Sequence, residues 1–591
     1  MEVKKKSFIW AMICAVSVVL FIVISNRIAP FLIDNDNIYL KTVVSGEMTG
    51  TPEMRGYHLG IISGFIMSSL YKLTGNYVPW FGIILCLYAG IVIWYVLYNL
   101  ATACKKWYMS LCCLAVGLLV SSSIFFRYFV QTQFTIIGGF LGAGAALALA
   151  LVQIDKTVKE NRANLIMLFV FALLSFSVRS SAFYMIIPFL GMILLDKFID
   201  YLGNKKESHF AVLVFAAGVI VLSMVINILA GKIAYSSEDW KSYDKYNELR
   251  ADMVDYEGFP DYEIYRDVYE KYGIKESSYR ALTEHYNLIL DKNINEESLA
   301  ALDEITRENR SRNNADLLGR LKEVFSSIIE RNIKDYTDRP INVFVFWMYA
   351  AVIVLAVLSK KFKAVRDVGF LIVARMFDWI YLVYNGRYPF RVTQIIYVAE
   401  LFLLVAIAIK YRLWERAFKK PFTRLKISPV FIASVLVICF IAVRFGLPVM
   451  RNVKNEAIGF DKMSVCFSEL EDYLEDHPDN FYFFDMTNLH YKERTLGFGE
   501  SAYENYVYMG SWITNSPWYN DKLKAHGIED PAVSLVERDD LYIIYQVDNT
   551  GSRDFLDEYF EEHFPGTKIN KADEFVSSNG FVYEILSVEK E

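Results

Sequence analysis

Long apolar stretches recur along almost the whole chain, and short polar turns separate them. A helix needs about 20 apolar residues to cross the ~30 Å hydrocarbon core of a bilayer. Eleven stretches come close to this length, although several are short and need neighbouring helices or little tilt. We predict membrane spans at residues 8–30, 78–101, 107–126, 129–154, 163–178, 180–196, 210–232, 341–359, 367–384, 391–409 and 429–447. The pattern therefore predicts an α-helical polytopic membrane protein.

The polar turns carry an orientation signal, because positive loops are retained in the cytoplasm. Three lysines, Lys4 to Lys6, precede the first span, which is long and lacks a small-residue cleavage site. Lysine-rich loops then follow every second span, at residues 105–106, 156–162, 197–206, 360–366 and 410–426. We therefore expect the N-terminus in the cytoplasm and the C-terminus on the outer side.

One further apolar segment, residues 58–73, does not fit this alternation as a span. Crossing the membrane there would place nearly every later lysine cluster on the outside. Gly60, Gly64, Ser68 and Lys72 recur at every fourth position, and larger apolar residues lie on the opposite side. This period predicts an amphipathic helix that lies in the membrane interface after the first span. The alternative is a short span that packs through its stripe of small residues.

Two long polar segments predict external structure. Residues 235–340 are charged, rich in tyrosine and periodic at helical spacing, so we expect a helical insert. After the last span, strands alternate with helices, which predicts a small α/β domain with a largely parallel sheet. The expected strands are Phe481–Phe484, Leu541–Tyr545 and Phe581–Leu586, and the expected helices are Phe460–Leu474 and 555–564.

These elements divide the chain into four parts. Residues 1–234 form the first part of the membrane domain, with the external loop and interfacial helix at 34–77. The insert (235–340), the second membrane part (341–447) and the external α/β domain (448–591) follow.

Composition and motifs narrow the class of function. The net charge of −6 conceals basic cytoplasmic loops and acidic external domains, so a nucleic-acid partner has no support. Of seven cysteines, only Cys466 lies in an external domain, which excludes an intramolecular disulfide there and fits a bacterial plasma membrane. The chain has no phosphate-binding Walker loop, no dinucleotide glycine motif in context and no HExxH zinc motif.

The first external loop opens with four polar residues, Asp34, Asn35, Asp36 and Asn37. A carboxylate at this place is suited to act as a general base or to hold a divalent cation such as Mg or Mn. The two asparagines add oxygen ligands and hydrogen-bond donors, and His58 is a candidate supporting residue near the loop. The alternative is that these residues only solvate and cap a helix end. No histidine, cysteine or carboxylate spacing identifies a metal site.

The short external turns carry arginine and no lysine, namely Arg127, Arg179, Arg387 and Arg391. A positive charge outside opposes the topological preference, and a guanidinium group matches phosphate oxygens bidentately. We predict that these arginines bind a lipid phosphate, with Arg387 and Arg391 as the best pair and Arg179 next. Snorkelling side chains that contact lipid headgroups are the alternative.

Arg375 and Asp378 lie inside the span 367–384 at helical i,i+3 spacing. Charges inside a membrane are costly unless they are compensated. We expect them to neutralise each other or a charge on another helix, with Glu400 as a further member of the network.

The order of these features resembles the GT-C superfamily of membrane glycosyltransferases, which includes protein O-mannosyltransferases, the aminoarabinose transferase of lipid A and oligosaccharyltransferases. The stretch from Asn35-Asp36-Asn37 through residues 45–52 and 69–71 is similar to a branch of uncharacterised Gram-positive bacterial membrane proteins. That branch often carries Asn-Asp-Asp, whereas this chain has Asn37 in place of the second acid. The departure weakens any mechanism that needs two carboxylates.

The resemblance implies transfer of a sugar from a polyprenyl-phosphate donor to an extracytoplasmic acceptor, which is a cell-envelope glycan, a lipid or a protein, with inversion at the anomeric carbon. Asp36 would take the proton of the acceptor hydroxyl or orient it through a metal. Arg387, Arg391 and then Arg179 would stabilise the departing lipid phosphate. A polysaccharide polymerase or ligase that uses lipid-linked glycans, a transporter or flippase, and a non-catalytic scaffold remain alternatives.

Overall fold

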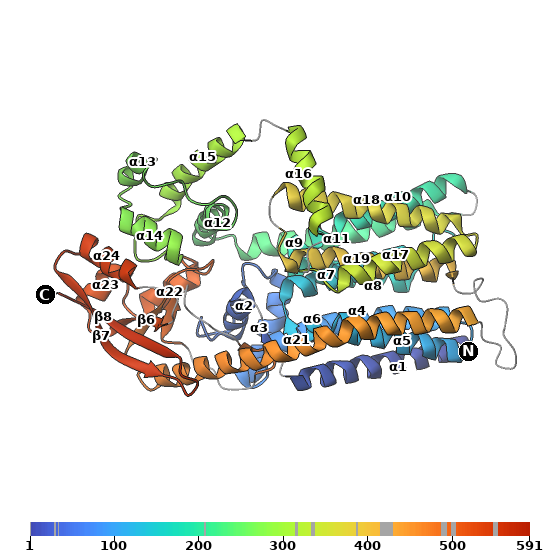
Figure 1. Ribbon diagram of the computed structural model, residues 1–591, viewed down its shortest axis with the longest axis horizontal. Helices are drawn as coiled ribbons and strands as arrows, with labels where there is room; N and C mark the ends of the chain where they lie inside the picture. Colours follow the sequence, from blue (N-terminus) through green and yellow to red (C-terminus); the bar gives the residue numbers. More distant parts are fainter. Residues whose placement is uncertain are drawn as a thin grey trace.

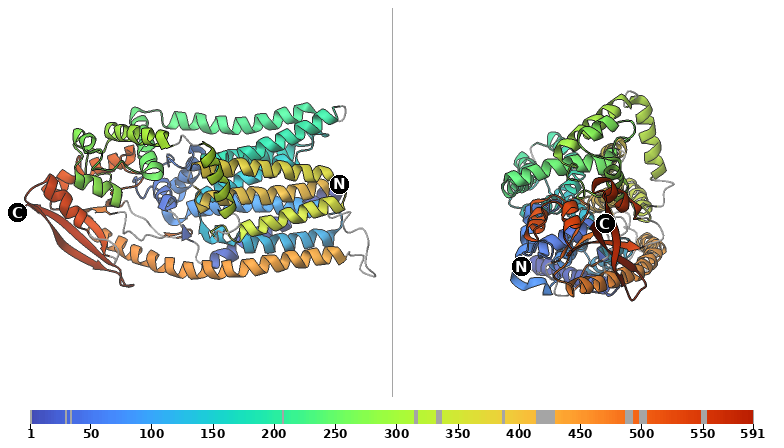
Figure 2. Two further views of the ribbon diagram at one scale, coloured as in Figure 1. Left: turned by 45° about the horizontal axis from the view of Figure 1, so that its top comes forward. Right: turned by 90° about the vertical axis from the view of Figure 1, so that its left-hand side faces the viewer.

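A computed structural model describes residues 2–28, 31–32, 35–205, 208–313, 317–331, 337–385, 388–413, 429–485, 493–497, 504–547 and 553–590. Long helices run side by side in one bundle, and a second, more compact part caps one end of it (Figure 1, Figure 2). The N-terminus lies at the uncapped end of the bundle, and the C-terminus lies in the cap. The protein is therefore a multi-pass membrane protein with a large polar part at one membrane face.

A helix occupies every one of the predicted spans. These helices are α1 (Glu2–Ser25), α4 (Trp80–Ala103), α5 (Trp107–Ile124), α7 (Phe134–Leu151), α8 (Arg162–Val178), α10 (Ile187–Gly203), α11 (Phe210–Ala234), α17 (Ile341–Leu358), α18 (Phe362–Tyr384), α19 (Phe390–Tyr411) and α21 (Pro429–Glu475). Within the described residues, nine stretches are long and apolar enough to cross by themselves. Of the others, α8 is apolar but has only 17 residues, and α18 carries charges that neighbouring helices compensate.

Helix α7 lies at the centre of the bundle, and all of its residues except Ala150 are buried. Its glycines make this packing possible. A Cβ atom on Gly139 would lie 2.5 Å from Ile395 of α19, and one on Gly142 would lie 2.5 Å from Ile186. Small residues let helices approach closely in a membrane, where no hydrophobic effect drives them together.

Helix α3 (Ile61–Thr74) is the segment predicted to lie outside the bilayer. Its 14 residues span about 21 Å, which is too short to cross. The side chains of Phe65 and Leu73 are 59% and 80% exposed, whereas the small-residue side of the helix is buried. The amide of Gly60, just before the helix, donates to the Ser177 carbonyl at 2.7 Å.

Contacts with the capping part show that the chain stays at one face between α1 and α4. Phe31, which follows α1, pairs with Arg494, and a Cβ atom on Gly82 of α4 would touch Thr495. The prediction of a non-crossing helix is therefore confirmed. The small-residue stripe does pack against protein, as the alternative proposed, but it packs at the membrane face.

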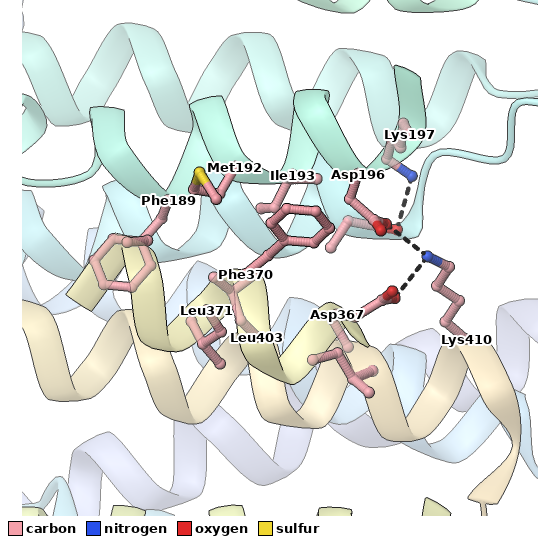
Figure 3. A pocket seen from close by; sticks show the side chains of 14 residues that line it. Phe189, Met192, Ile193, Asp196, Lys197, Asp367, Phe370, Leu371, Leu403 and Lys410 are labelled. Carbon is pink, nitrogen blue, oxygen red and sulfur yellow. Dashed lines mark hydrogen bonds and ion pairs between the residues drawn. The ribbon is translucent and has the colours of Figure 1, made fainter. Parts of the chain in front are cut away.

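The lysine-rich loops gather at the end of the bundle that carries the N-terminus. Lys363 pairs with Asp200 at 3.0 Å, and the amide of His209 donates to the Ile154 carbonyl at 2.8 Å. Lys410 pairs with Asp367 at 2.8 Å and with Asp196 at 3.3 Å beside a largely apolar cavity of about 460 Å³ (Figure 3). The charges at this end are mutually compensated, so the cluster explains how α10, α18 and α19 are tied together.

The intramembrane ion pair differs in part from the expectation. Arg375 of α18 pairs with Glu400 of α19 at 2.6 Å, and the Tyr349 hydroxyl donates to the same carboxylate at 2.7 Å. Glu400 has no exposed surface, so it requires a compensating charge within the bundle. Asp378 is not the partner of Arg375, and its Oδ2 atom accepts no hydrogen bond from the described residues.

The external insert is helical, as predicted. It comprises α12 (Glu238–Ala251), the π-helical turn η3 (Asp252–Glu257), α13 (Arg266–Lys271), α14 (Glu276–His285), α15 (Glu296–Asn313) and α16 (Leu317–Ile329). It joins the C-terminal domain through buried contacts. The Tyr559 hydroxyl donates to the Leu290 carbonyl at 2.6 Å, and the ring of His285 stacks on Phe555 at 3.7 Å.

The C-terminal domain contains a five-stranded sheet in the order β5-β3-β6-β8-β7. Its strands are β3 (Phe481–Phe484), β5 (Tyr506–Tyr508), β6 (Leu541–Val547), β7 (Thr567–Val576) and β8 (Val582–Lys590), and its helices are α22 (Pro517–Ala525), α23 (Pro531–Glu537) and α24 (Asp554–His563). The α/β class is confirmed, but the expectation of a largely parallel sheet is wrong. Strands β5, β3 and β6 are parallel, whereas β8 is antiparallel to β6 and forms a hairpin with β7.

The last span and the first helix of this domain are one continuous helix, which corrects the expected boundary near residue 448. Helix α21 runs for 47 residues, about 70 Å, and passes through Pro448. A small sheet provides a second connection, since β1 (Phe31–Leu32) pairs with β2 (Gln131–Thr132) and with β4 (Glu493–Arg494). The C-terminal domain is therefore fixed to the bundle at two points.

The arrangement at the membrane predicts the result of a labelling experiment. In a variant without native cysteines, a membrane-impermeant maleimide should label Tyr77→Cys, just after α3, in intact cells. It should label Lys105→Cys, in a lysine-bearing turn, only after the membrane is permeabilised. Labelling of Lys105→Cys but not of Tyr77→Cys in intact cells would contradict this arrangement, because it would mean either that the orientation is reversed or that α3 crosses.

Candidate functional site

Asp36 lies in the first turn of α2 (Asn35–Ser45), the short helix that follows the first span. A carboxylate is favoured there, because the N-terminus of a helix carries a partial positive charge. The indole N–H of Trp512, in the C-terminal domain, donates to Oδ1 of Asp36 at 3.0 Å. The acid that the sequence singled out is thus oriented by a residue 476 positions away.

Trp512 lies where the three external parts of the protein meet. Its ring is 4.8 Å from the ring of His58 and 6.3 Å from that of Tyr57, which it stacks on, both in the first external loop. From the insert, the hydroxyl of Tyr243 donates to the Trp512 carbonyl. This tryptophan therefore connects Asp36 to His58 and fixes the distance between the loop, the insert and the C-terminal domain.

Asn37, next to Asp36, has a structural position. Its side chain has no exposed surface, and its amide donates to the Thr132 carbonyl at 3.1 Å. Its carbonyl oxygen accepts the N–H of Phe134 at 3.0 Å, so the side chain joins α2 to the start of α7. The Phe134 ring in turn supports the guanidinium group of Arg179 at 5.2 Å. Asn37 therefore helps to place Asp36 and Arg179 relative to each other.

His58 is partly buried, and its surroundings are cationic. Burial lowers the pKa of His58 well below its usual value, and the positive charges of Arg179, Arg250 and Arg391 lower it further. The imidazole is therefore neutral near pH 7, because a fourth positive charge would be unfavourable there. The same three guanidinium groups make the surroundings of His58 favourable for an anion.

The backbone explains the placement of two of these arginines. Arg179 has an extended conformation between α8 and α9 (Ser180–Tyr184), next to Ser177, which binds the amides of Gly60 and Ser63. Arg391 lies in the first turn of α19, where its positive charge opposes the helix dipole. A bound anion would relieve this unfavourable interaction, because helix N-termini and guanidinium groups both attract phosphate.

Arg250 and Trp512 were not predicted from the sequence. Arg250 lies on α12 of the insert, is only 5% exposed, and donates to Asn247 at 2.7 Å. No motif surrounds either residue, and the helical spacing of tyrosines around Arg250 indicated only a buried face. The only local signal for Arg250 in the sequence was the presence of an arginine in an acidic external insert.

The structure does not bring every predicted residue to this place. Arg127 pairs with Glu456 of α21 at 3.1 Å and donates to Gln131 at 2.6 Å, so it holds α21 against the small sheet. Asp34, Arg387 and the side chain of Asn35 lie outside the described residues. Of the predicted residues, Asp36 and His58 both contact Trp512, and the charges of Arg179 and Arg391 act on His58.

A divalent cation at Asp36 stays a prediction, because Asp34, the other candidate ligand, lies outside the described residues. Within the described residues, no three histidine, cysteine, aspartate or glutamate side chains gather as metal ligands. The charges that act on His58 are those of guanidinium groups, which would repel Mg or Mn. The surroundings instead favour an anionic group held by arginine beside a carboxylate that can accept a proton.

Comparison with known proteins gives one structural likeness. No protein-family model matches the chain. No curated protein matches it either. The chain is similar to the crystal structure of ArnT from Cupriavidus metallidurans bound to undecaprenyl phosphate, with 11% identity, coverage of 98% of each chain and a TM-score of 0.36. A TM-score this low assigns neither an activity nor the role of any residue.

The position of Asn37 predicts a stability effect. Asn37→Ala should lower the thermal unfolding temperature of the purified protein by several degrees, because it leaves a buried carbonyl and a buried N–H unpaired. Each unsatisfied group costs about 1–3 kcal/mol. Differential scanning fluorimetry in detergent measures the shift, with Asn204→Ala, an exposed position on a lysine-rich loop, as the control. An unchanged unfolding temperature for Asn37→Ala would contradict the structural role.

Proposed function

We propose that the protein is a GT-C-type glycosyltransferase of the bacterial plasma membrane, which transfers a sugar from a polyprenyl-phosphate donor to an extracytoplasmic acceptor hydroxyl. One observation carries the proposal. Trp512 contacts both Asp36 and His58, and three arginines act on His58, at the capped end of the helix bundle. A base next to a phosphate-binding pocket at the membrane face is what this transfer requires.

The carboxylate of Asp36 and the three arginines have separate roles in the proposed reaction. Asp36 accepts the proton of the acceptor hydroxyl as its oxygen forms a bond to the anomeric carbon. The bond between that carbon and the phosphate oxygen breaks, and the lipid phosphate leaves with an additional negative charge. Arg179, Arg250 and Arg391 stabilise that charge, and burial strengthens their effect.

The neutral state of His58 fits this division of roles. A neutral imidazole donates or accepts a hydrogen bond without competing with the phosphate for the arginines. The His58 ring packs on Trp512 at 4.8 Å, and Trp512 also binds the carboxylate of Asp36. We assign His58 to the orientation of the sugar between its donor phosphate and its acceptor, and not to proton transfer.

Asp36→Asn tests the base. The amide oxygen still accepts the hydrogen bond of the Trp512 indole, so the fold should persist while proton acceptance is lost. We expect kcat for transfer to fall about 10²- to 10⁴-fold, the usual contribution of a positioned base. Membranes with matched protein levels, given radiolabelled polyprenyl-phosphate sugars and native envelope glycans, provide the measurement. Transfer at the wild-type rate by Asp36→Asn would exclude Asp36 as the base.

The arginines can be tested against an internal control. Arg391→Gln and Arg179→Gln should each reduce kcat/KM for the lipid donor about 10²- to 10³-fold, as the loss of one group that stabilises an oxyanion does. Arg127→Gln, which instead loses the ion pair with Glu456, should change unfolding temperature more than donor kinetics. Equal kinetic losses in all three variants would contradict a specific phosphate pocket.

A further inference from the structure

A polar cleft of about 460 Å³ lies between the three external parts of the protein. Its lining comes from the first external loop, from α12 of the insert and from α22 of the C-terminal domain, all beyond the end of the helix bundle (Figure 1). The lining residues are Thr49, Thr51, Glu53, Arg55, Ser237, Asp239, Trp240, Pro517, Trp518, Asp521, Lys522 and Ala525. A cleft of this volume accommodates a ligand of several rings.

The wall of the cleft contacts the candidate site. Trp518, in its wall, packs edge-on against Trp512 at 6.3 Å between ring centroids. Trp512 donates to Asp36, so a chain of two indoles connects the cleft to the carboxylate. A ligand in the cleft that contacts Trp518 is therefore one aromatic contact and one hydrogen bond away from Asp36.

The wall formed by the first external loop is rigid. Gly46 has a φ of +89°, and a Cβ atom there would lie 2.6 Å from the backbone nitrogen of Pro52. The amide of Glu53 then donates to the Val43 carbonyl at 3.1 Å, which folds the loop back onto α2. The cleft is therefore a preformed feature, because the same helix that carries Asp36 anchors its wall.

The charges in the cleft leave an acidic excess. Glu53 and Arg55 neutralise each other through two bonds of 2.9 and 2.8 Å, and the guanidinium group packs on Trp240 at 5.4 Å. Lys522 is 3.9 Å from Glu504, behind the cleft wall. The carboxylates of Asp239 and Asp521 form no hydrogen bond or ion pair with any described residue, and both residues are exposed. Two acceptor groups are thus available to a ligand, and a polyanion would be repelled.

The polar groups match a polyhydroxylated chain. Hydroxyls, carboxylates and a guanidinium group, set beside two indoles, can donate to and accept from many sugar hydroxyls. The indole N–H of Trp518, which is 7% exposed, has no hydrogen-bond partner among the described residues. A buried donor without a partner is unusual, and a ligand oxygen would complete it. A lipid tail has no matching surface, because the lining is predominantly polar.

We infer that this cleft binds a neutral or amine-bearing glycan, not a polyanionic one, with one end of the glycan directed toward Asp36. The identification of this glycan as the acceptor rests on the proposed function, whereas its binding does not. Asp239 and Asp521 determine its specificity, since they accept hydrogen bonds from sugar hydroxyls or ammonium groups and repel phosphates and carboxylates.

Direct binding tests the cleft. End-labelled glycans released from the cell envelope are separated by ion exchange into a neutral or amine-bearing fraction and a polyanionic fraction. The full-length protein in detergent should bind the first fraction at least tenfold more tightly than the second. The Asp239→Ala/Asp521→Ala double variant should lose at least tenfold of this affinity, and Glu238→Ala, next to the cleft on the same helix, should bind as wild type does. Failure of the wild type to bind, a preference for polyanions, or undiminished binding by the double variant would overturn the inference.

Kinetics and Asp36 separate this inference from the proposed function. The double variant should raise KM for the acceptor while kcat and the donor KM stay unchanged, and Asp36→Asn should bind the neutral glycan as wild type does. Glycan binding without any transfer by the wild type would contradict the glycosyltransferase and leave the cleft assigned. Asp36-dependent transfer without a difference in binding between the two glycan fractions would support the glycosyltransferase and overturn the assignment of the cleft.

Discussion

A single buried amide, the side chain of Asn37, determines where the candidate site can form. It binds the Thr132 carbonyl and the Phe134 amide, two backbone groups at the start of the most buried helix of the bundle. Because α7 is enclosed by other helices, its N-terminus is a fixed reference point. Asn37 thereby fixes the position of Asp36, its neighbour in the chain. The Phe134 ring fixes the position of Arg179, whose guanidinium group packs on it. A carboxylate at residue 37 could accept the Phe134 amide but could not donate to the Thr132 carbonyl, so the departure from an Asn-Asp-Asp pattern has a structural reason.

The second requirement is that the C-terminal domain stays on the first external loop, because it supplies Trp512. The amide of Glu504 donates to the Glu47 carbonyl at 3.2 Å, and Glu47 pairs with Lys41 of α2 at 2.5 Å. Burial raises the pKa of Glu504 to about 7, and burial lowers the pKa of its partner Lys522 to about 8. A buried pair of this kind adds little net stability but is costly to separate, so it favours one arrangement of domain and loop. Helix α21, which is continuous from the bilayer to the sheet, limits the alternatives further.

The sequence predicted those features that depend on local patterns. Nine of the predicted spans lie on helices that are long and apolar enough to cross, and the non-crossing α3 was found because charge orientation adds an independent constraint. The sheet was less predictable. β5 has only three residues, and most of β7 is exposed and charged, so neither has a strand signal of its own. Trp512 and Arg250 could not be assigned to the site, because their roles arise from contacts between segments far apart in the chain. Arg127 shows the opposite case. It was predicted to bind a lipid phosphate, and nothing near it in the sequence indicated its ion pair with Glu456.

The surroundings of His58 and the lining of the cleft carry charges of opposite sign, and this contrast fits the proposed transfer reaction. On the membrane side of Trp512, three arginines act on a neutral histidine and favour a phosphate. On its outer side, the cleft has an acidic excess through Asp239 and Asp521 and disfavours one. Under the proposed function, the arginines would attract the donor headgroup and the cleft would bind an uncharged glycan, with Asp36 as the proton acceptor. The charged lipid phosphate would then stay with the arginines after transfer, and the lengthened glycan would stay in the cleft. The indole rings of Trp512 and Trp518 pack against each other, so they lie between these two environments and connect them.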